Sequence, residues 1–137
     1  MYDTGSPVRA ALIASAAAGP LFLASFAAAS AYLQLPHPIV VRAQDLDFGL
    51  VMAATMAGFI IGFLPNLVGS AVMKAIGDTN AAARSAALWT AVGAAAGTAI
   101  ALLFYGPQPD PTGSFAFIAT SAICARLCRT QMDWGAE

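Results

Sequence analysis

The chain has 137 residues, of which 59% are hydrophobic and 9% are charged, whereas a soluble domain carries about 25% charged residues. A chain this apolar has too few polar side chains to cover a surface that faces water. This composition excludes a soluble enzyme or binding domain. The net charge of -1 supplies no basic patch for nucleic acid. We therefore expect an integral membrane protein, with the lipid bilayer as its first partner.

Four long stretches without charged residues predict four membrane-spanning helices. A spanning helix needs about 20 apolar residues, and three of the stretches reach this length once the non-helical Pro36-His37-Pro38 is set apart. The fourth reaches the minimum if Arg126 extends to the lipid headgroups. We expect an all-α fold, an integral membrane four-helix bundle with short loops, as a single transmembrane domain over 1-137. The predicted helices cover about 7-33, 48-76, 80-105 and 113-129.

Capping residues predict where these helices begin and end. Ser6 is a good N-cap, with Pro7 at the first helical position, and Asp47 is placed to cap the second helix. Gly77 is expected to end the second helix in a left-handed conformation. The run 78-80 (Asp-Thr-Asn) would then cap the third helix after a very short turn. Helices two and three are therefore expected to form an antiparallel hairpin.

The positive charges predict the orientation of the chain. With four spans, one side of the membrane receives both termini and the turn between helices two and three. The positive-inside rule places this side in the cytoplasm, because it would hold five of the six Lys and Arg residues. These five are Arg9, Lys74, Arg84, Arg126 and Arg129, with Arg42 on the other side. The alanine-rich, lysine-poor composition indicates a GC-rich bacterial genome, so we expect a multi-pass protein of the bacterial inner (plasma) membrane.

A cleaved secretory signal peptide is the alternative interpretation of residues 1-31. Ala29-Ser30-Ala31 has the small residues of a cleavage site. The N-terminal region, however, carries one arginine that is offset by Asp3. Its apolar stretch is also longer than the roughly 7-15 residues typical of a signal peptide. We therefore expect these residues to form the first helix.

Small residues repeat along one face of the second and third helices. Within a bilayer, close packing joins helices in place of the hydrophobic effect, and small side chains let the backbones approach. The second helix has Gly58-x-x-x-Gly62 and Gly69 on one face, opposite large apolar residues that suit lipid. The third helix has Gly93-x-x-x-Gly97. These five glycines are the predicted helix-packing residues.

Pro65 and Asn66 are the most unusual residues of the predicted second helix, where they are expected to produce a kink. Pro65 cannot donate a hydrogen bond to the carbonyl of Ile61, which leaves an acceptor in need of another partner. Asn66 could hydrogen-bond at that kink or across to a neighbouring helix, which is the interpretation we favour. Alternatively, Pro65 and Asn66 form a hinge or a polar lining.

No catalytic, cofactor or metal site is predicted. Cys124 and Cys128 share a helix face, but two thiols without a nearby histidine make half of a metal site at best. His37 is the single histidine and stands in a loop. No ionisable residue lies deep in the predicted spans, which disfavours a proton-coupled transporter. No nucleophile is paired with a base, so the sequence predicts no enzyme.

Two functions remain. The leading hypothesis is a non-catalytic protein that acts by helix packing, as an accessory or scaffold subunit of other membrane proteins or as a homo-oligomer. The alternative is a small channel or facilitator for a small solute or ion. Its polar lining would come from Asn66, Thr55, Thr90 and Thr98. A conduit needs these side chains along one water-accessible path, whereas a packing subunit buries its small residues in dry contacts.

Overall fold

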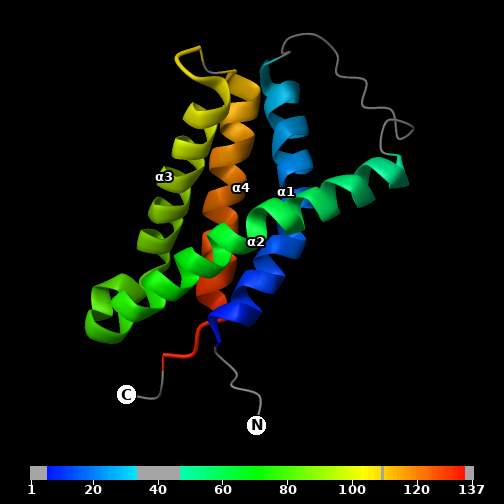
Figure 1. Ribbon diagram of the computed structural model, residues 1–137. Helices are drawn as coiled ribbons and strands as arrows, with labels where there is room; N and C mark the ends of the chain where they lie inside the picture. Colours follow the sequence, from blue (N-terminus) through cyan, green and yellow to red (C-terminus); the bar gives the residue numbers. More distant parts are fainter. Residues whose placement is uncertain (1–5, 34–46, 109, 135–137) are drawn as a thin grey trace.

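The computed structural model describes residues 6-33, 47-108 and 110-134 (Figure 1). All regular structure in these residues is helical, which confirms the all-helical expectation with four long helices. The elements are α1 (Pro7–Leu33), α2 (Phe48–Thr79), the short 3₁₀ helix η2 (Ala81–Arg84), α3 (Ala86–Tyr105) and α4 (Pro111–Thr130).

The starts of α1, α2 and α4 follow local capping. The backbone N–H of Arg9 donates to Ser6 Oγ at 3.3 Å, and α1 begins at Pro7 as predicted. The Asp47 side chain accepts from the N–H of Gly49, and α2 begins at Phe48. Asp110 accepts from the N–H of Gly113 at 2.6 Å, so α4 begins at Pro111, two residues before the predicted start. Each cap satisfies a backbone donor that the first helical turn leaves free.

The connection between α2 and α3 differs from the prediction. Gly77 lies inside α2, which continues to Thr79, and positive φ among the described residues occurs only at Gly106. Asn80 caps η2 by accepting from the N–H of Ala82. Ser85 then caps α3 by accepting from the N–H of Leu88. A separate helical turn therefore stands where a tight turn was expected.

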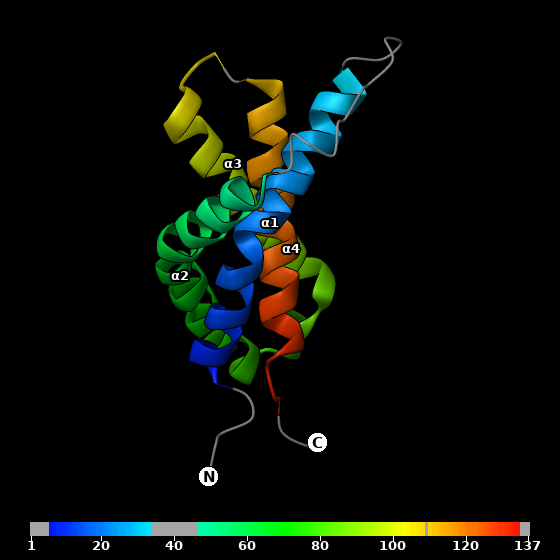
Figure 2. The ribbon, with the colours of Figure 1, turned by 90° about the vertical axis from the view of Figure 1, so that its right-hand side faces the viewer.

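The four long helices form two closely packed pairs. α1 packs against α2, and α3 packs against α4, while α4 also packs against α1 and so lies between α1 and α3 (Figures 1 and 2). α2 crosses α1 steeply and makes no extended contact with α3; the two meet through η2 at one end. The predicted hairpin of helices two and three is therefore wrong, because the small face of α2 packs on α1.

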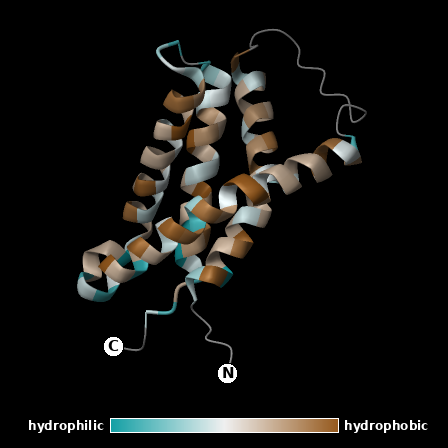
Figure 3. Ribbon diagram, in the orientation of Figure 1, coloured by the Kyte–Doolittle hydropathy of each residue, from teal (hydrophilic) through white to brown (hydrophobic). Residues whose placement is uncertain are grey.

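Three helices, α1, α2 and α3, are long and apolar enough to cross a membrane. α4 is less apolar than these three, and it buries one face, with buried residues spaced three or four apart. This buried face consists of Gly113, Ala116, Thr120, Cys124 and Cys128. Figure 3 shows strongly hydrophobic residues along the helices and strongly hydrophilic ones mainly near their ends. The pattern is that of a membrane protein.

Candidate functional site: a lateral groove between two helix pairs

Glycines bring the backbones of α1 and α2 into direct contact. A Cβ added to Gly58 would lie 2.5 Å from the backbone nitrogen of Gly19 and 2.7 Å from its Cα. A Cβ added to Gly19 would in turn overlap the backbone of Ala54. Neither position has room for a side chain unless a backbone moves. Gly19 was not among the predicted packing residues. It is the single glycine of α1, and a lone glycine in a long apolar helix is the sequence signal that could have identified it.

Glycines also bring α3 and α4 together. A Cβ on Gly93 would lie 2.5 Å from the carbonyl oxygen of Ser121, and one on Gly97 would lie 2.6 Å from that of Phe117. Both glycines are buried, and both face the backbone of α4. The small residues of α3 are thus used within the chain.

Gly62 and Gly69 have looser surroundings. A Cβ on Gly62 would make an ordinary contact, 3.6 Å from the Cβ of Ala18 on α1, whereas one on Gly69 would meet nothing within 4 Å. Gly69 instead borders open space on the side of α2 that turns toward α3. Of the five predicted glycines, Gly69 therefore makes no helix contact in the described part of the chain.

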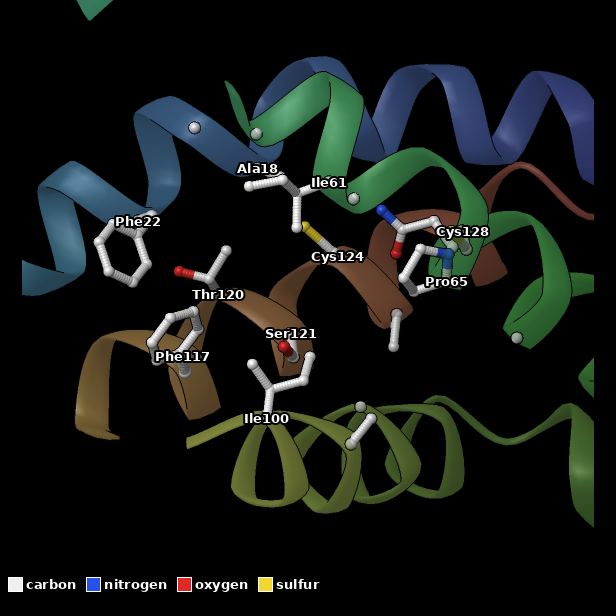
Figure 4. A pocket seen from close by; sticks show the side chains of 18 of the residues that line it. Ala18, Phe22, Ile61, Pro65, Ile100, Phe117, Thr120, Ser121, Cys124 and Cys128 are labelled. Carbon is white, nitrogen blue, oxygen red and sulfur yellow. The ribbon is translucent and has the colours of Figure 1, made fainter. Parts of the chain in front are cut away.

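A groove opens where α2 and α3 fail to meet. Its volume is about 530 Å³, and residues of all four long helices line it (Figure 4). Gly69 and Ile61 belong to the α2 wall and Ala96 to the α3 wall, while Thr120 and Cys124 come from α4. The groove is partly open, and none of the described residues that line it carries a charge.

Polar groups of α2 tie this helix to α1. The Asn66 Nδ2 donates a hydrogen bond to Ser15 Oγ at 3.2 Å. Ser70 Oγ is within donating distance of the carbonyl oxygens of Pro7, at 3.3 Å, and Leu67, at 3.0 Å. Pro65 lies inside the continuous helix and lines the groove beside Asn66. The Asn66 amide thus makes an interhelical hydrogen bond.

The threonines proposed as a polar lining do not converge. Thr55, Thr90 and Thr98 each donate to the carbonyl four residues earlier in their own helix, at 2.7, 2.8 and 2.9 Å. None of the three lines the groove. Their hydroxyls are satisfied locally, as is common for threonine inside helices. Asn66 is therefore the one member of the proposed polar set that reaches the groove.

Thr120 behaves differently from these threonines. It is 8% exposed, and its Oγ1 has no hydrogen-bond partner among the described residues. Figure 4 shows Thr120 and Cys124 projecting from α4 toward α1 and α2, with the rings of Phe22 and Phe117 near Thr120. Ser114 Oγ is a second buried hydroxyl without a partner in the same residues, but it does not line the groove.

The cysteines lie at the contact between α1 and α4. Cys124 Sγ is 3.5 Å from the carbonyl oxygen of Ala14, and Cys128 Sγ is 3.7 Å from that of Ala10. Both thiols are free and buried. Within the described ranges, no three His, Cys, Asp or Glu residues gather as metal ligands. His37 lies outside those ranges.

Cationic residues and Trp134 join three segments at one end of the bundle. Arg84 Nε donates to the carbonyl oxygen of Gly77, and Arg129 Nε donates to that of Arg84, both at 2.9 Å. Lys74 and Arg84 stand 6.0 and 5.7 Å from the centre of the Trp134 ring, within the range of cation–π attraction. The same ring lies against Gly77, which leaves no space for a Cβ there.

No protein-family model, curated protein or solved structure matches this chain. The lateral groove and the helix contacts are therefore the features from which a function can be inferred.

Proposed function

We propose that this chain is a non-catalytic, multi-pass protein of the bacterial inner membrane that acts by helix packing. It would serve as an accessory or scaffold subunit of other membrane proteins, or as a homo-oligomer. The observation that carries this proposal is the absence of an extended contact between α2 and α3. A closed four-helix bundle packs each helix against two neighbours around a common core. Here α2 has α1 as its one extensive neighbour, and one side of the bundle stays open.

The walls of the open side suit a helix from another chain. Gly69 of α2 and Ala96 of α3 both line the groove and are small, and small residues let helices approach closely in a bilayer. Gly58 and Gly93 are already used within the chain, whereas Gly69 is not. A helix of a partner, or of a second copy, along the rims of the groove would supply the missing neighbour.

The proposed orientation follows from the ends of the helices. The start of α1, the connection from α2 to α3 and the end of α4 lie at the same end of the bundle (Figures 1 and 2). Five of the six Lys and Arg residues belong to or adjoin these segments. The positive-inside rule therefore favours a cytoplasmic location for this end, and with it for both termini.

A channel or facilitator is less well supported. Such a conduit needs polar side chains along one path, but the three threonine hydroxyls bond to their own helices. The Asn66 amide bonds to Ser15 on α1. The groove that remains is largely apolar and lies between α2 and α3, which make no extended contact with each other.

Site-specific photo-crosslinking in native membranes tests the packing function. The photo-reactive residue p-benzoylphenylalanine would replace Ala96 on the groove wall or, as a control, Leu103. Leu103 is 85% exposed on the same helix and lies outside the groove. We expect one defined protein adduct from position 96 and lipid adducts from position 103. An adduct of twice the 13.9 kDa chain mass indicates a homo-oligomer, and any other single mass indicates a partner subunit.

A blocking variant makes this experiment specific for the groove. Adding Gly69→Phe on the opposite wall should suppress the adduct from position 96, because the larger side chain occupies the approach of the second helix. Indistinguishable adducts from positions 96 and 103, or an adduct unaffected by Gly69→Phe, would contradict the proposal.

A further inference from the structure

We propose that this chain binds one anionic phospholipid, with an acyl chain in the groove and the phosphate at a cationic cluster where the groove ends. The cationic cluster consists of Lys74, Arg84 and Arg129, which are joined by their contacts with Trp134 or with one another. This site goes beyond the packing function and does not depend on it, because residues of this chain alone form it.

The groove reaches the cationic cluster at one end of the bundle. Its lining includes Met73 of α2 and Cys128 of α4. Met73 directly precedes Lys74 in the sequence, and Cys128 directly precedes Arg129. Both lining residues belong to a buried cluster against which Trp134 packs. One elongated molecule with an apolar body and a charged head can therefore contact the groove and the cations together.

The walls of the groove suit a hydrocarbon chain. No Asp, Glu, Lys, Arg or His is among the described residues that line it, so a charged headgroup inside it would be buried without a counter-ion at high cost. Its volume of about 530 Å³ lies in the range of about 300–1,000 Å³ that small-molecule sites have. A partner helix, about 10 Å across with its side chains, would lie over this space on the rims. A single acyl chain is much thinner and can lie within it.

The charges at this end of the bundle favour an anion. Among the described residues it holds five cationic side chains but only two carboxylates, those of Asp78 and Asp133. The ion pair of Lys74 with Asp78 is 30% and 53% exposed, and such exposed pairs are weak. Arg129 donates its Nε–H to the carbonyl oxygen of Arg84, which orients the guanidinium. Its terminal amino groups are the donors that bind phosphate in a bidentate manner.

The cationic cluster lies where two apolar helices end. α2 and α3 are both long and apolar enough to cross a membrane. Lys74 is the first charged residue after the start of α2, and Arg84 is the last one before α3. Phospholipid headgroups border the hydrocarbon core, so these cations stand at the level of the phosphates. Basic residues between helices at this level bind anionic headgroups.

Three probes test this inference on the purified full chain in detergent micelles, with native mass spectrometry as the measure of bound lipid. Phosphatidylglycerol and phosphatidylcholine with the same oleoyl chains differ in net charge. Glycerol phosphate carries the phosphate without any chain. We expect phosphatidylglycerol to bind about fivefold tighter than phosphatidylcholine, or better, and glycerol phosphate not to bind measurably.

Matched charge variants test the cationic cluster. Lys74→Gln and Arg129→Gln should each lower the affinity for phosphatidylglycerol about fivefold and change that for phosphatidylcholine little. Arg126→Gln removes the same charge from an exposed residue of α4 outside the cluster and should leave both affinities unchanged. This control separates a local site from a general attraction between opposite charges.

A second pair of variants tests the groove. Ala96→Phe should narrow the groove and lower the affinity for both lipids, whereas Ala95→Phe, at a neighbouring residue that does not line it, should not. Equal affinity of the wild-type chain for the two lipids would overturn the inference, as would tight binding of glycerol phosphate. Unchanged phosphatidylglycerol affinity in Ala96→Phe, or in both Lys74→Gln and Arg129→Gln, would do the same. Because the purified chain is used without a partner, such a failure leaves the packing function untouched.

Discussion

A Cβ placed on Gly93 would lie 2.5 Å from the carbonyl oxygen of Ser121, whereas one placed on Gly69 would meet no atom within 4 Å. Both glycines belong to small-residue faces of long apolar helices. Their surroundings differ because Gly93 faces the backbone of α4, while Gly69 borders the open groove. The same substitution should therefore have opposite effects at the two positions.

We predict that Gly93→Ala lowers the free energy of unfolding by about 1–3 kcal/mol, the usual range for overpacking a close contact. Gly69→Ala should leave it unchanged or raise it by up to about 1 kcal/mol, because alanine favours the helical backbone more than glycine does. Reversible unfolding in mixed detergent micelles measures both values. Equal destabilisation by the two variants would show that Gly69 also lies in a helix contact.

Residues near helix ends show which parts of the fold local sequence determines. The starts of α1 and α2 were predicted correctly, because Ser6 and Asp47 act on the turn that follows them. The start of α3 was not, because Asn80 and Ser85 are both good caps and lie five positions apart. In the structure Arg84 and Trp134 both contact Gly77, and contacts of this kind cannot be inferred from the few residues around a cap.

At the scale of the helix, Trp134 should hold the last turns of α2 in place. Its ring covers Gly77 and attracts the cations of Lys74 and Arg84. In Trp134→Ala, we predict faster amide hydrogen exchange in residues 77-84, with the rest of α2 unchanged. Tyr32→Ala, at an exposed residue of α1, serves as the control. Unaltered exchange in residues 77-84 would mean that the Trp134 contact adds nothing to the stability of this end.

α4 should depend on its neighbours for insertion into the membrane. It is the least apolar of the long helices, and it carries Arg126, which opposes insertion by up to about 3 kcal/mol near a helix centre. In an insertion assay with isolated segments, 111-130 should insert poorly and 86-105 efficiently. Equally efficient insertion would show that packing between α1 and α3 is not what retains α4.

At the scale of the whole molecule, the sequence pattern identifies packing faces but not the helices that meet. The small residues on α2 could pack against either α1 or α3. The sequence-based prediction of a hairpin paired α2 with α3. The direct contact of Gly58 with Gly19 instead joins α2 to α1 and leaves the groove. Thr120 could not be singled out from the sequence for the same reason, because burial of its hydroxyl without a partner results from the way the helices pack.

Disulfide formation between engineered cysteine pairs tests most directly whether α2 packs on α1 and leaves the side toward α3 open. In a background without the two native cysteines, Ala18→Cys with Gly62→Cys should oxidise readily within one chain. A Cβ on Gly62 lies 3.6 Å from that of Ala18, which suits a disulfide. Ile61→Cys with Ala96→Cys, on opposite walls of the groove, should stay reduced. Rapid bridging of the second pair and none of the first would contradict the open bundle.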